Sequence, residues 1–318
     1  MSKVKNQHYV PQYYLKNFAD SQKRGASHIW VFDKFNQNTF STIVRNVASQ
    51  RYFYDISKEL VNVQDEQWIE KFLADFDGES NKLVGRVFKK IENLRKKSDE
   101  KTYSINVITP SIKKNLSYLL AFQYLRTREF RDLFSELFEK SFSSILEVML
   151  KAQSPGKIHE IRGKFNDEYL PIYQGNQIFK SFKNISEIIC TYIWTIGINT
   201  TDQPLFTSDN PVVKQAHLES NAFGSPGIEI AFPLSPQTIL IIFENTHFSK
   251  ESPLDNKLCL LSLEAVNYYN RLQVSYSRRQ IYCNEDKFNL VKKICQDYPE
   301  ICSENKSRIN IISGINHD

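Results

Sequence analysis

Three polar residues that lie far apart in the sequence have the chemistry needed for acid–base catalysis on a phosphate. His8 precedes a proline-fixed turn and a short helix, so a rigid backbone can orient an imidazole that gives or takes a proton. Arg126 falls on the apolar stripe of a long helical segment, where a guanidinium needs an acid, a phosphate or carbonyl groups as partners. Asp209 follows a strand at a tight polar turn, a place suited to an active-site carboxylate. We therefore interpret His8 as general acid or base, Arg126 as phosphate clamp and Asp209 as the group that orients His8.

Three neighbouring polar residues are candidates for substrate binding. Gln123 lies one helical turn before Arg126, and Ser208 and Asn210 flank Asp209. Each feature also has a structural explanation. His8 can cap the short helix, Arg126 can form an ion pair with Asp209 or another carboxylate, and residues 206–212 can be ordinary turn chemistry. The catalytic hypothesis requires His8, Arg126 and Asp209 to lie within ~10 Å of one another, because side chains further apart cannot meet.

Other catalytic signatures are missing from the sequence. It contains no nucleophile elbow, no zinc-peptidase helix, no phosphate-binding loop and no dinucleotide-binding glycine pattern. A metal-dependent nuclease of the restriction type needs a lysine where Ala231 stands, two residues after Glu229. The five cysteines form no C-x-x-C pair, and His217 and His247 lack a metal-binding spacing. We expect neither a metal nor a cofactor.

Composition bounds the class of protein more than its reaction. The 318 residues include 41 Lys+Arg and 36 Asp+Glu, and the resulting charge of +5 is weak evidence for a polyanionic partner. With 22 Phe and 16 Tyr against 10 Gly, the chain has many rigid anchors and few flexible loops. No stretch reaches the ~18 apolar residues needed to span a bilayer, and the polar N-terminus does not look like a secretory signal. We expect a cytoplasmic protein with reduced thiols and no membrane partner.

Changes in hydrophobic period divide the chain into β, α and β segments. Residues 28–32 and 38–44 have the β-branched and aromatic character of a hairpin, and residues 52–54 close this unit. From residue 65 the period becomes helical, and Thr109-Pro110 opens a long stretch, interpreted as two helices, that runs to about residue 151. A further helix is expected over about 178–186. Strands then follow at 191–198, 228–232, 238–243 and 280–283, with a helix over 261–272 and a helical tail from 287.

This order predicts an α+β fold in one composite domain. We expect a β-containing N-terminal unit (1–57), a helical segment (58–190), a β-rich segment (191–285) and a helical tail (286–318). The N-terminal unit is too small to hold a core alone, so it should pack on a C-terminal antiparallel sheet. Both would pack on the central helices, which position Gln123 and Arg126.

Four motifs together resemble a large bacterial family of unknown function. They are His8-Tyr-Val-Pro-Gln-Tyr-Tyr-Leu-Lys-Asn-Phe18, Gln123-Tyr-Leu-Arg126-Thr, Thr207-Ser-Asp-Asn-Pro211 and Phe232-Pro-Leu-Ser-Pro236. Their order is similar to that of the domain-of-unknown-function family numbered 4238, over about residues 5–285. The resemblance implies no established reaction. It implies that His8, Gln123, Arg126, Ser208, Asp209 and Asn210 belong together, in a kind of bacterial protein that often proves to be a toxin or an anti-phage effector.

Three hypotheses follow from these observations. In the first, the protein is a toxin or anti-phage effector acting on a phosphate-bearing substrate, as a metal-independent ribonuclease or a nucleotide-processing enzyme. In the second, it is a non-enzymatic sensor of a phage or host protein, with aromatic residues as its anchor surface. In the third, the four motifs only hold the β units to the helices. The sequence does not determine the substrate, the trigger or the oligomeric state.

Overall fold

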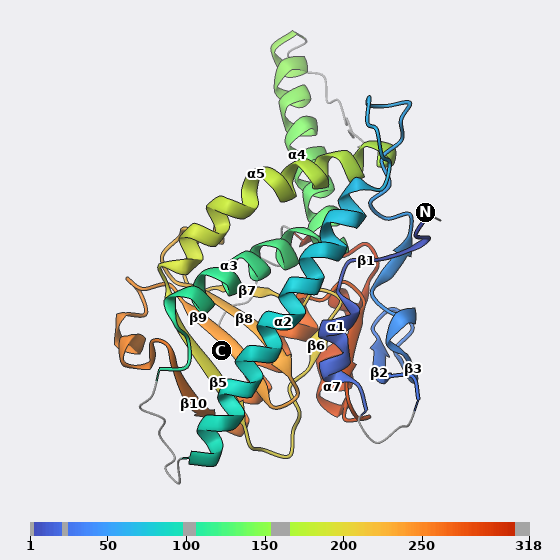
Figure 1. The fold of residues 1–318 in the computed structure, drawn as a ribbon. Helices are drawn as coiled ribbons and strands as arrows, with labels where there is room; N and C mark the ends of the chain where they lie inside the picture. Colours follow the sequence, from blue (N-terminus) through green and yellow to red (C-terminus); the bar gives the residue numbers. More distant parts are fainter. Residues whose placement is uncertain (1–2, 21–24, 98–105, 154–165, 309–318) are drawn as a thin grey trace.

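The structure is a computed structural model that describes residues 3–20, 25–97, 106–153 and 166–308 (Figure 1). Strands lie towards both ends of the chain and long helices lie between them, so the predicted α+β class is confirmed. Among the described residues, no helix is both long enough and apolar enough to cross a membrane.

A five-stranded sheet forms the centre of the C-terminal half. Its strands are β5 (Ile193–Asn199), β7 (Val213–Ala216), β8 (Ile228–Ser235), β9 (Thr238–Phe243) and β10 (Lys257–Leu261), in the order β10-β5-β9-β8-β7. All pairs are antiparallel except β10 with β5. The expectation of a purely antiparallel sheet is therefore corrected at this edge. The chain leaves β9, passes through the 3-10 turn η4 (Ser249–Leu254) and returns on the far side of β5, which makes β10 parallel to it.

Helices cover one face of this sheet, as Figure 1 shows. They are α2 (Trp68–Lys97), α3 (Pro110–Leu125) and α5 (Leu170–Cys190), and α4 (Arg128–Gln153) follows α3 after a short break. The Thr109 hydroxyl accepts from the Ile112 amide at 3.3 Å and caps α3, with Pro110 in its first turn, as the sequence predicts. Leu116, Leu120 and Trp194 share one core cluster, because the apolar stripe of α3 faces β5.

The opposite face is covered by α6 (Leu263–Tyr276), which Ser262 caps through a 3.2 Å bond from the Ala265 amide. Val266 and Leu272 of α6 pack against Ile239 and Ile241 of β9. Because helices cover both faces, every residue of β5 is buried, including the polar Thr195 and Asn199.

The N-terminal unit joins a second sheet. It contains β1 (Asn6–His8), α1 (Gln12–Leu15), β2 (His28–Asp33), β3 (Asn38–Ile43) and β4 (Ser49–Arg51), with 3-10 turns η1 (Lys16–Phe18) and η2 (Val44–Asn46). β1 pairs with β4, whereas β2 joins β3, β11 (Gln280–Cys283) and β6 (Thr207–Ser208) in the order β3-β2-β11-β6. The N-terminal unit thus shares hydrogen bonds with C-terminal strands rather than only packing on them.

Other boundaries differ from those expected. α5 extends over twenty-one residues instead of about nine. β8 continues to Ser235 instead of ending at residue 232, and a register shift between Pro233 and Ser235 accommodates the proline inside the strand. The chain then passes through α7 (Asn289–Asp297) and η5 (Pro299–Cys302). The last residues of the expected tail, 309–318, lie outside the described residues.

Candidate functional site: a closed ionic cluster and a cationic cavity

The structure divides the six predicted residues into two groups. His8, Gln123 and Arg126 meet where β1 contacts the end of α3, whereas Ser208, Asp209 and Asn210 lie beside the end of α6 and the start of β11. The described residues give Asp209 no hydrogen bond or ion pair with His8 or Arg126. The catalytic roles stay predictions, and the two groups are best described separately.

Arg126 is buried, and two of its three guanidinium nitrogens have protein partners, whereas its Nε is buried without a hydrogen-bond partner. Its Nη1 donates to Asp77 Oδ1 at 2.6 Å and its Nη2 donates to the His8 carbonyl at 2.9 Å. Its own carbonyl accepts from the Tyr54 hydroxyl at 2.7 Å. Burial would lower the pKa of Arg126, but Asp77 outweighs this and keeps it above the ordinary arginine value. The structural alternative of an ion pair is thus present, with Asp77 rather than Asp209 as the acid. We call Arg126, Asp77, His8 and Gln123 the Arg126 cluster.

The side chains of Gln123 and His8, the remaining members of the Arg126 cluster, also contact backbone carbonyls. Gln123 Nε2 donates to the Tyr9 carbonyl at 3.2 Å, which ties α3 to the chain after β1. His8 Nε2 lies 3.2 Å from the Arg45 carbonyl, a geometry that suits a ring N–H donating to that oxygen. Burial lowers the pKa of His8, so the neutral imidazole is favoured in the folded state.

Glu70, on the first turn of α2, is close enough to interact electrostatically with Arg126 and Asp77. Burial raises its pKa to about 7, although Arg126 acts in the opposite direction, and its Oε2 is buried without a hydrogen-bond partner. Burial likewise raises the pKa of Asp77 despite its contact with Arg126. Two carboxylates on one face of α2 therefore share a single arginine, and the Arg126 cluster has no spare positive charge for a phosphate.

Asp209 holds the start of β11 in place. Its Oδ1 accepts from the Arg278 amide at 2.8 Å, and its Oδ2 accepts from the Arg279 and Gln280 amides at 2.8 and 2.9 Å. Burial raises the pKa of Asp209, and these amides oppose the rise. A carboxylate with three backbone donors in this geometry positions a loop. Sequence analysis identified Asp209 as a candidate, but it could not predict the partners of its carboxylate, because they are backbone amides and any residue type can supply them.

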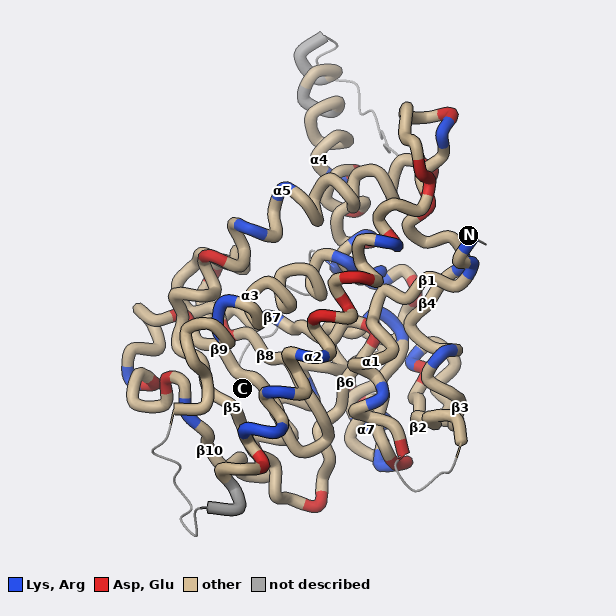
Figure 2. Tube along the Cα trace, in the orientation of Figure 1, with Lys and Arg blue, Asp and Glu red and all other residues tan. Residues whose placement is uncertain are grey.

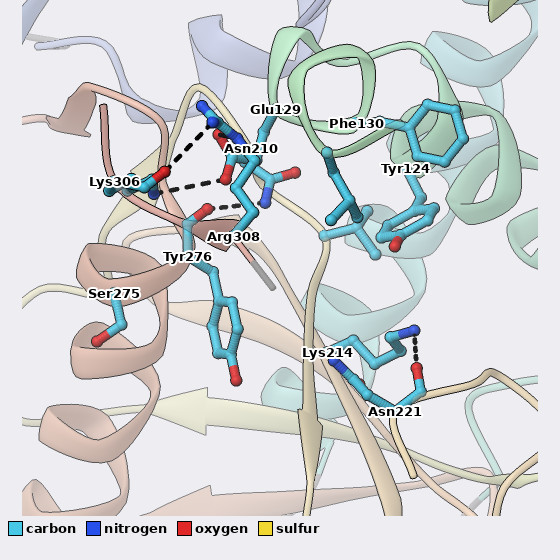
Figure 3. A pocket seen from close by; sticks show the side chains of 12 residues that line it. Tyr124, Glu129, Phe130, Asn210, Lys214, Asn221, Ser275, Tyr276, Lys306 and Arg308 are labelled. Carbon is cyan, nitrogen blue, oxygen red and sulfur yellow. Dashed lines mark hydrogen bonds and ion pairs between the residues drawn. The ribbon is translucent and has the colours of Figure 1, made fainter. Parts of the chain in front are cut away.

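The flanking residues attach the same turn to α6. Ser208 Oγ donates to Gln273 Oε1 at 2.8 Å, and Gln273 Nε2 donates to the Pro211 carbonyl at 2.9 Å. Asn210 Nδ2 donates to the Tyr276 carbonyl at 2.9 Å, which fixes the amide, and its oxygen points away from that carbonyl in Figure 3. Asn210 also lines a cavity.

This cavity, of about 60 Å³, lies between the start of α4, β7, the end of α6 and the C-terminal segment (Figure 3). Its charged lining residues are three cations and one carboxylate: Lys214, Lys306, Arg308 and Glu129. Tyr124 and Tyr276 supply aromatic walls. The volume is far below the ~300 Å³ of a pocket that encloses a whole drug-sized ligand, so it suits a single polar group such as a phosphate. We call this space the Lys214 cavity.

Lys214 is the least compensated cation of the Lys214 cavity. Its Nζ donates to the Asn221 carbonyl and lies 4.4 Å from the centre of the Phe223 ring and 5.6 Å from that of Tyr124. Among the described residues, no carboxylate forms an ion pair with it. Burial lowers the pKa of Lys214 to about 8, so both the ammonium and the amine are populated near neutral pH. Desolvated amines of this kind are typical of functional sites.

The other cations in and around the Lys214 cavity outnumber the carboxylates that form ion pairs with them. Glu129 lies 3.4 Å from Lys306 Nζ and 3.2 Å from Arg308 Nε. Asp132, one turn further along α4, contacts three guanidinium groups, at 3.0 Å from Arg128, 2.6 Å from Arg278 and 3.0 Å from Arg308. Burial would raise the pKa of Asp132, but these arginines hold it below the ordinary value. The region therefore carries excess positive charge beside open space.

Sequence reasoning missed Lys214, Tyr276 and Arg308. Arg308 lies in a segment that had been assigned only to a helical tail, and the fold brings it to α4 through the bond of its amide to Glu136 at 2.9 Å. One signal was available for Lys214. It follows the Thr207–Pro211 motif and alternates with buried Val213 and Gln215 along β7, which places it on the opposite face of the strand.

A second polar network was also passed over. Glu229 is buried, lies 2.8 Å from His217 Nε2 and accepts from the Tyr268 and Tyr269 hydroxyls at 2.8 and 2.9 Å. Burial, and then Glu229, raise the pKa of both tyrosines far above the ordinary value. Because Glu229 on β8 accepts from both tyrosines of α6, the network fastens α6 to β8.

These features define an α+β protein with a small cationic cavity beside a motif-bearing turn. A family model described as protein of unknown function (DUF4238) matches residues 6–287, and the chain belongs to this family. Neither the curated proteins nor the solved structures contain a match. Within the described residues, no group of three or more His, Cys, Asp or Glu side chains is arranged to hold a metal ion.

Proposed function

We propose that the protein is an enzyme acting on a phosphate-bearing substrate, RNA or a nucleotide, and that the reacting phosphate enters the Lys214 cavity. The observation that supports this most directly is the Lys214 ammonium, buried against two aromatic rings with no carboxylate partner among the described residues. Such a group gains more from a phosphate than an exposed lysine does, because the surrounding dielectric is lower.

The cavity residues can supply the three functions that metal-independent phosphodiester cleavage requires. Arg308 is the clamp for the non-bridging oxygens, since a guanidinium matches phosphate geometry. The Glu129 carboxylate accepts the proton of the attacking hydroxyl, and the Lys214 ammonium gives a proton to the leaving oxygen. A lysine with a pKa of about 8 is a stronger acid than an ordinary lysine. The predominance of cations in the lining favours a phosphate and disfavours a metal ion.

In this proposal the six predicted residues have different roles from those first assigned. Asn210 contacts the substrate, and Ser208 and Asp209 position the turn that carries it. His8, Gln123 and Arg126 hold the N-terminal unit against α2 and α3. RNA and nucleotides are abundant in the cytoplasm, where we propose that the protein works. Their degradation would arrest a bacterial host, as expected of a toxin or an anti-phage effector.

The test compares Lys214→Met with wild type in the presence of EDTA, using total RNA and nucleoside triphosphates as substrates. We expect wild type to cleave one of them, Lys214→Met to lose about 100-fold or more in rate, and Lys183→Met, an exposed lysine on α5, to match wild type. The rate should also fall as pH rises through about 8, because the Lys214 ammonium is the reactive form.

Growth of a bacterial host after induction provides the second readout. Arrest with degraded RNA in wild type, relieved in Lys214→Met, supports the proposal. A His8→Ala variant that folds normally but has no activity would instead assign catalysis to the Arg126 cluster. Phosphate binding without turnover of either substrate would contradict an enzymatic role and favour a sensor of a phage or host component.

A further inference from the structure

Two cysteines lie in contact where α7 is followed by η5. Cys295 is on α7 and Cys302 ends η5, and both belong to one buried cluster that also contains Cys283. The Tyr298 amide, between the two elements, donates to the Ile294 carbonyl at 2.9 Å, and η5 packs against α7. Residues seven apart in the sequence are thus brought together, and a hydrogen bond joins the two thiols. We call Cys295 and Cys302 the thiol pair.

The two members of the thiol pair have different charge states, as Figure 2 helps to explain by the mixed charges around the end of the chain. The Cys295 thiol donates to the Cys302 sulfur, which lowers the pKa of Cys302 to about 7 and raises that of Cys295. Lys34 and Lys306 also favour the Cys302 thiolate, whereas burial and Glu300 oppose it. About half of Cys302 is therefore thiolate at pH 7, against about 1% for a thiol at the ordinary value of 9.0.

Cys302 is also the more accessible member of the thiol pair. Its exposed fraction is 8%, against 3% for Cys295 and 0% for Cys283. Burial raises the pKa of the Cys283 thiol to about 12, so Cys283 keeps its proton although it lies in the same cluster. A thiolate that small molecules can reach, next to a second thiol, is the arrangement of a cysteine that oxidation attacks selectively.

We propose that the thiol pair is a peroxide-reactive site that closes into a reversible disulfide. The Cys302 thiolate attacks one oxygen of hydrogen peroxide, the O–O bond breaks, and the other oxygen leaves as hydroxide, which takes up the proton that Cys302 had released. Cys302 is then a sulfenic acid. The Cys295 sulfur attacks it, the S–O bond breaks, and the oxygen leaves as water with the proton of Cys295. Two thiols are oxidised by two electrons in total, and one peroxide is reduced to two molecules of water.

The surroundings of the thiol pair permit this bond to form. Sulfurs that already share a hydrogen bond approach to the ~2.05 Å of a disulfide chiefly by rotation of their side chains. Residues 296–300, which connect Cys295 to the last turn of η5, are all exposed, so this connection can adjust without disturbing the core. The inference does not depend on the proposed enzymatic function.

The experiment treats the reduced, folded full chain with hydrogen peroxide at pH 7. Remaining thiols are then blocked with N-ethylmaleimide in denaturant, and the peptides are mapped by mass spectrometry. Wild type should contain a Cys295–Cys302 disulfide that dithiothreitol reverses. In Cys295→Ala the disulfide should be lost, and Cys302 should stop at the sulfenic acid, which dimedone captures. The control Cys283→Ala removes a buried thiol of the same cluster and should form the disulfide like wild type.

Three results would overturn the proposal, and the first needs no variant. Wild type in which N-ethylmaleimide still labels both cysteines after peroxide treatment has no reactive thiol pair. A disulfide that joins Cys302 to Cys283 or to a second copy of the chain gives Cys295 no role as the resolving thiol. A Cys302→Ala variant in which dimedone captures Cys295 as readily as it captures Cys302 in Cys295→Ala shows that Cys302 is not the nucleophile.

Discussion

The Arg126 cluster and the Lys214 cavity are both polar, both partly buried and both adjacent to family motifs, yet their charges are arranged in opposite ways. In the Arg126 cluster one arginine is held by Asp77 and a backbone carbonyl, with Glu70 as a second acid nearby. In the Lys214 cavity Lys306 and Arg308 share Glu129, whereas Lys214 has no carboxylate partner among the described residues and lies beside open space. The difference shows that burial of a charge does not identify a site. What distinguishes the two regions is whether the charge is already compensated and whether space adjoins it.

The largest expected effect is a loss of stability, and it tests whether the Arg126 cluster has a structural role. Arg126→Met removes the cation from Asp77 and leaves the His8 carbonyl without its donor, so the free energy of unfolding should fall by about 3–5 kcal/mol. Urea unfolding followed by circular dichroism measures it. Lys82→Met, which breaks an exposed pair with Glu79 on α2, should change stability by no more than about 0.5 kcal/mol. An Arg126→Met protein of normal stability but without activity would reverse our assignment of the two regions.

A smaller effect of opposite sign is expected in the Lys214 cavity. Lys214→Met removes an uncompensated charge and keeps the apolar stem, so the free energy of unfolding at pH 7 should rise by about 1 kcal/mol. Because the folded-state pKa of Lys214 is lowered to about 8, wild-type stability rises with pH from about 8 towards the ordinary lysine value of 10.5. The advantage of the variant should therefore shrink by pH 10. A loss of several kcal/mol at pH 7 would show that Lys214 is structural.

The smallest effect concerns the pH dependence of the Arg126 cluster. Burial raises the pKa of Glu70 from 4.5 to about 7, so the folded state binds this proton more tightly than the unfolded chain does. Stability from this group is present below about pH 4.5 and is lost as pH rises through 7. Glu70→Gln should therefore raise the melting temperature at pH 8 and leave it nearly unchanged at pH 5. Asp75→Asn, on an exposed position of α2, is the matched control. Equal effects of Glu70→Gln at both pH values would contradict the charge balance that we describe.

Local features of the fold were predictable because their causes are local. Thr109 and Pro110 begin α3 where a hydroxyl cap and a proline belong, and the hairpin of β2 and β3 follows from two β-branched runs around a turn. The burial of Gln123 and Arg126 followed from their place on an apolar stripe. The parallel partner of β5 was not predictable, because strand order depends on which edge a connection reaches.

Partners of polar side chains were the least predictable part of the candidate site. Asp209 was expected to face His8, but it is saturated by three amides at the start of β11, seventy residues further along the chain. Asp77 and Glu70 sit on an amphipathic helix with other acids, and nothing in their spacing marks them as neighbours of Arg126. Lys214 and Arg308 come from opposite ends of the C-terminal half and meet only through the packing of α4 against the last segment.

The sequence by itself determined the family, the α+β class and the residues that must be buried or must turn, because these depend on periodicity and on the chemistry of short segments. Only the tertiary structure decided which charges compensate each other. Coulomb energy and desolvation depend on distance and surroundings in space. In the folded protein Arg126 is neutralised by Asp77, whereas Lys214 is uncompensated and lies beside a cavity. From the sequence alone, Arg126 was the candidate and Lys214 was not.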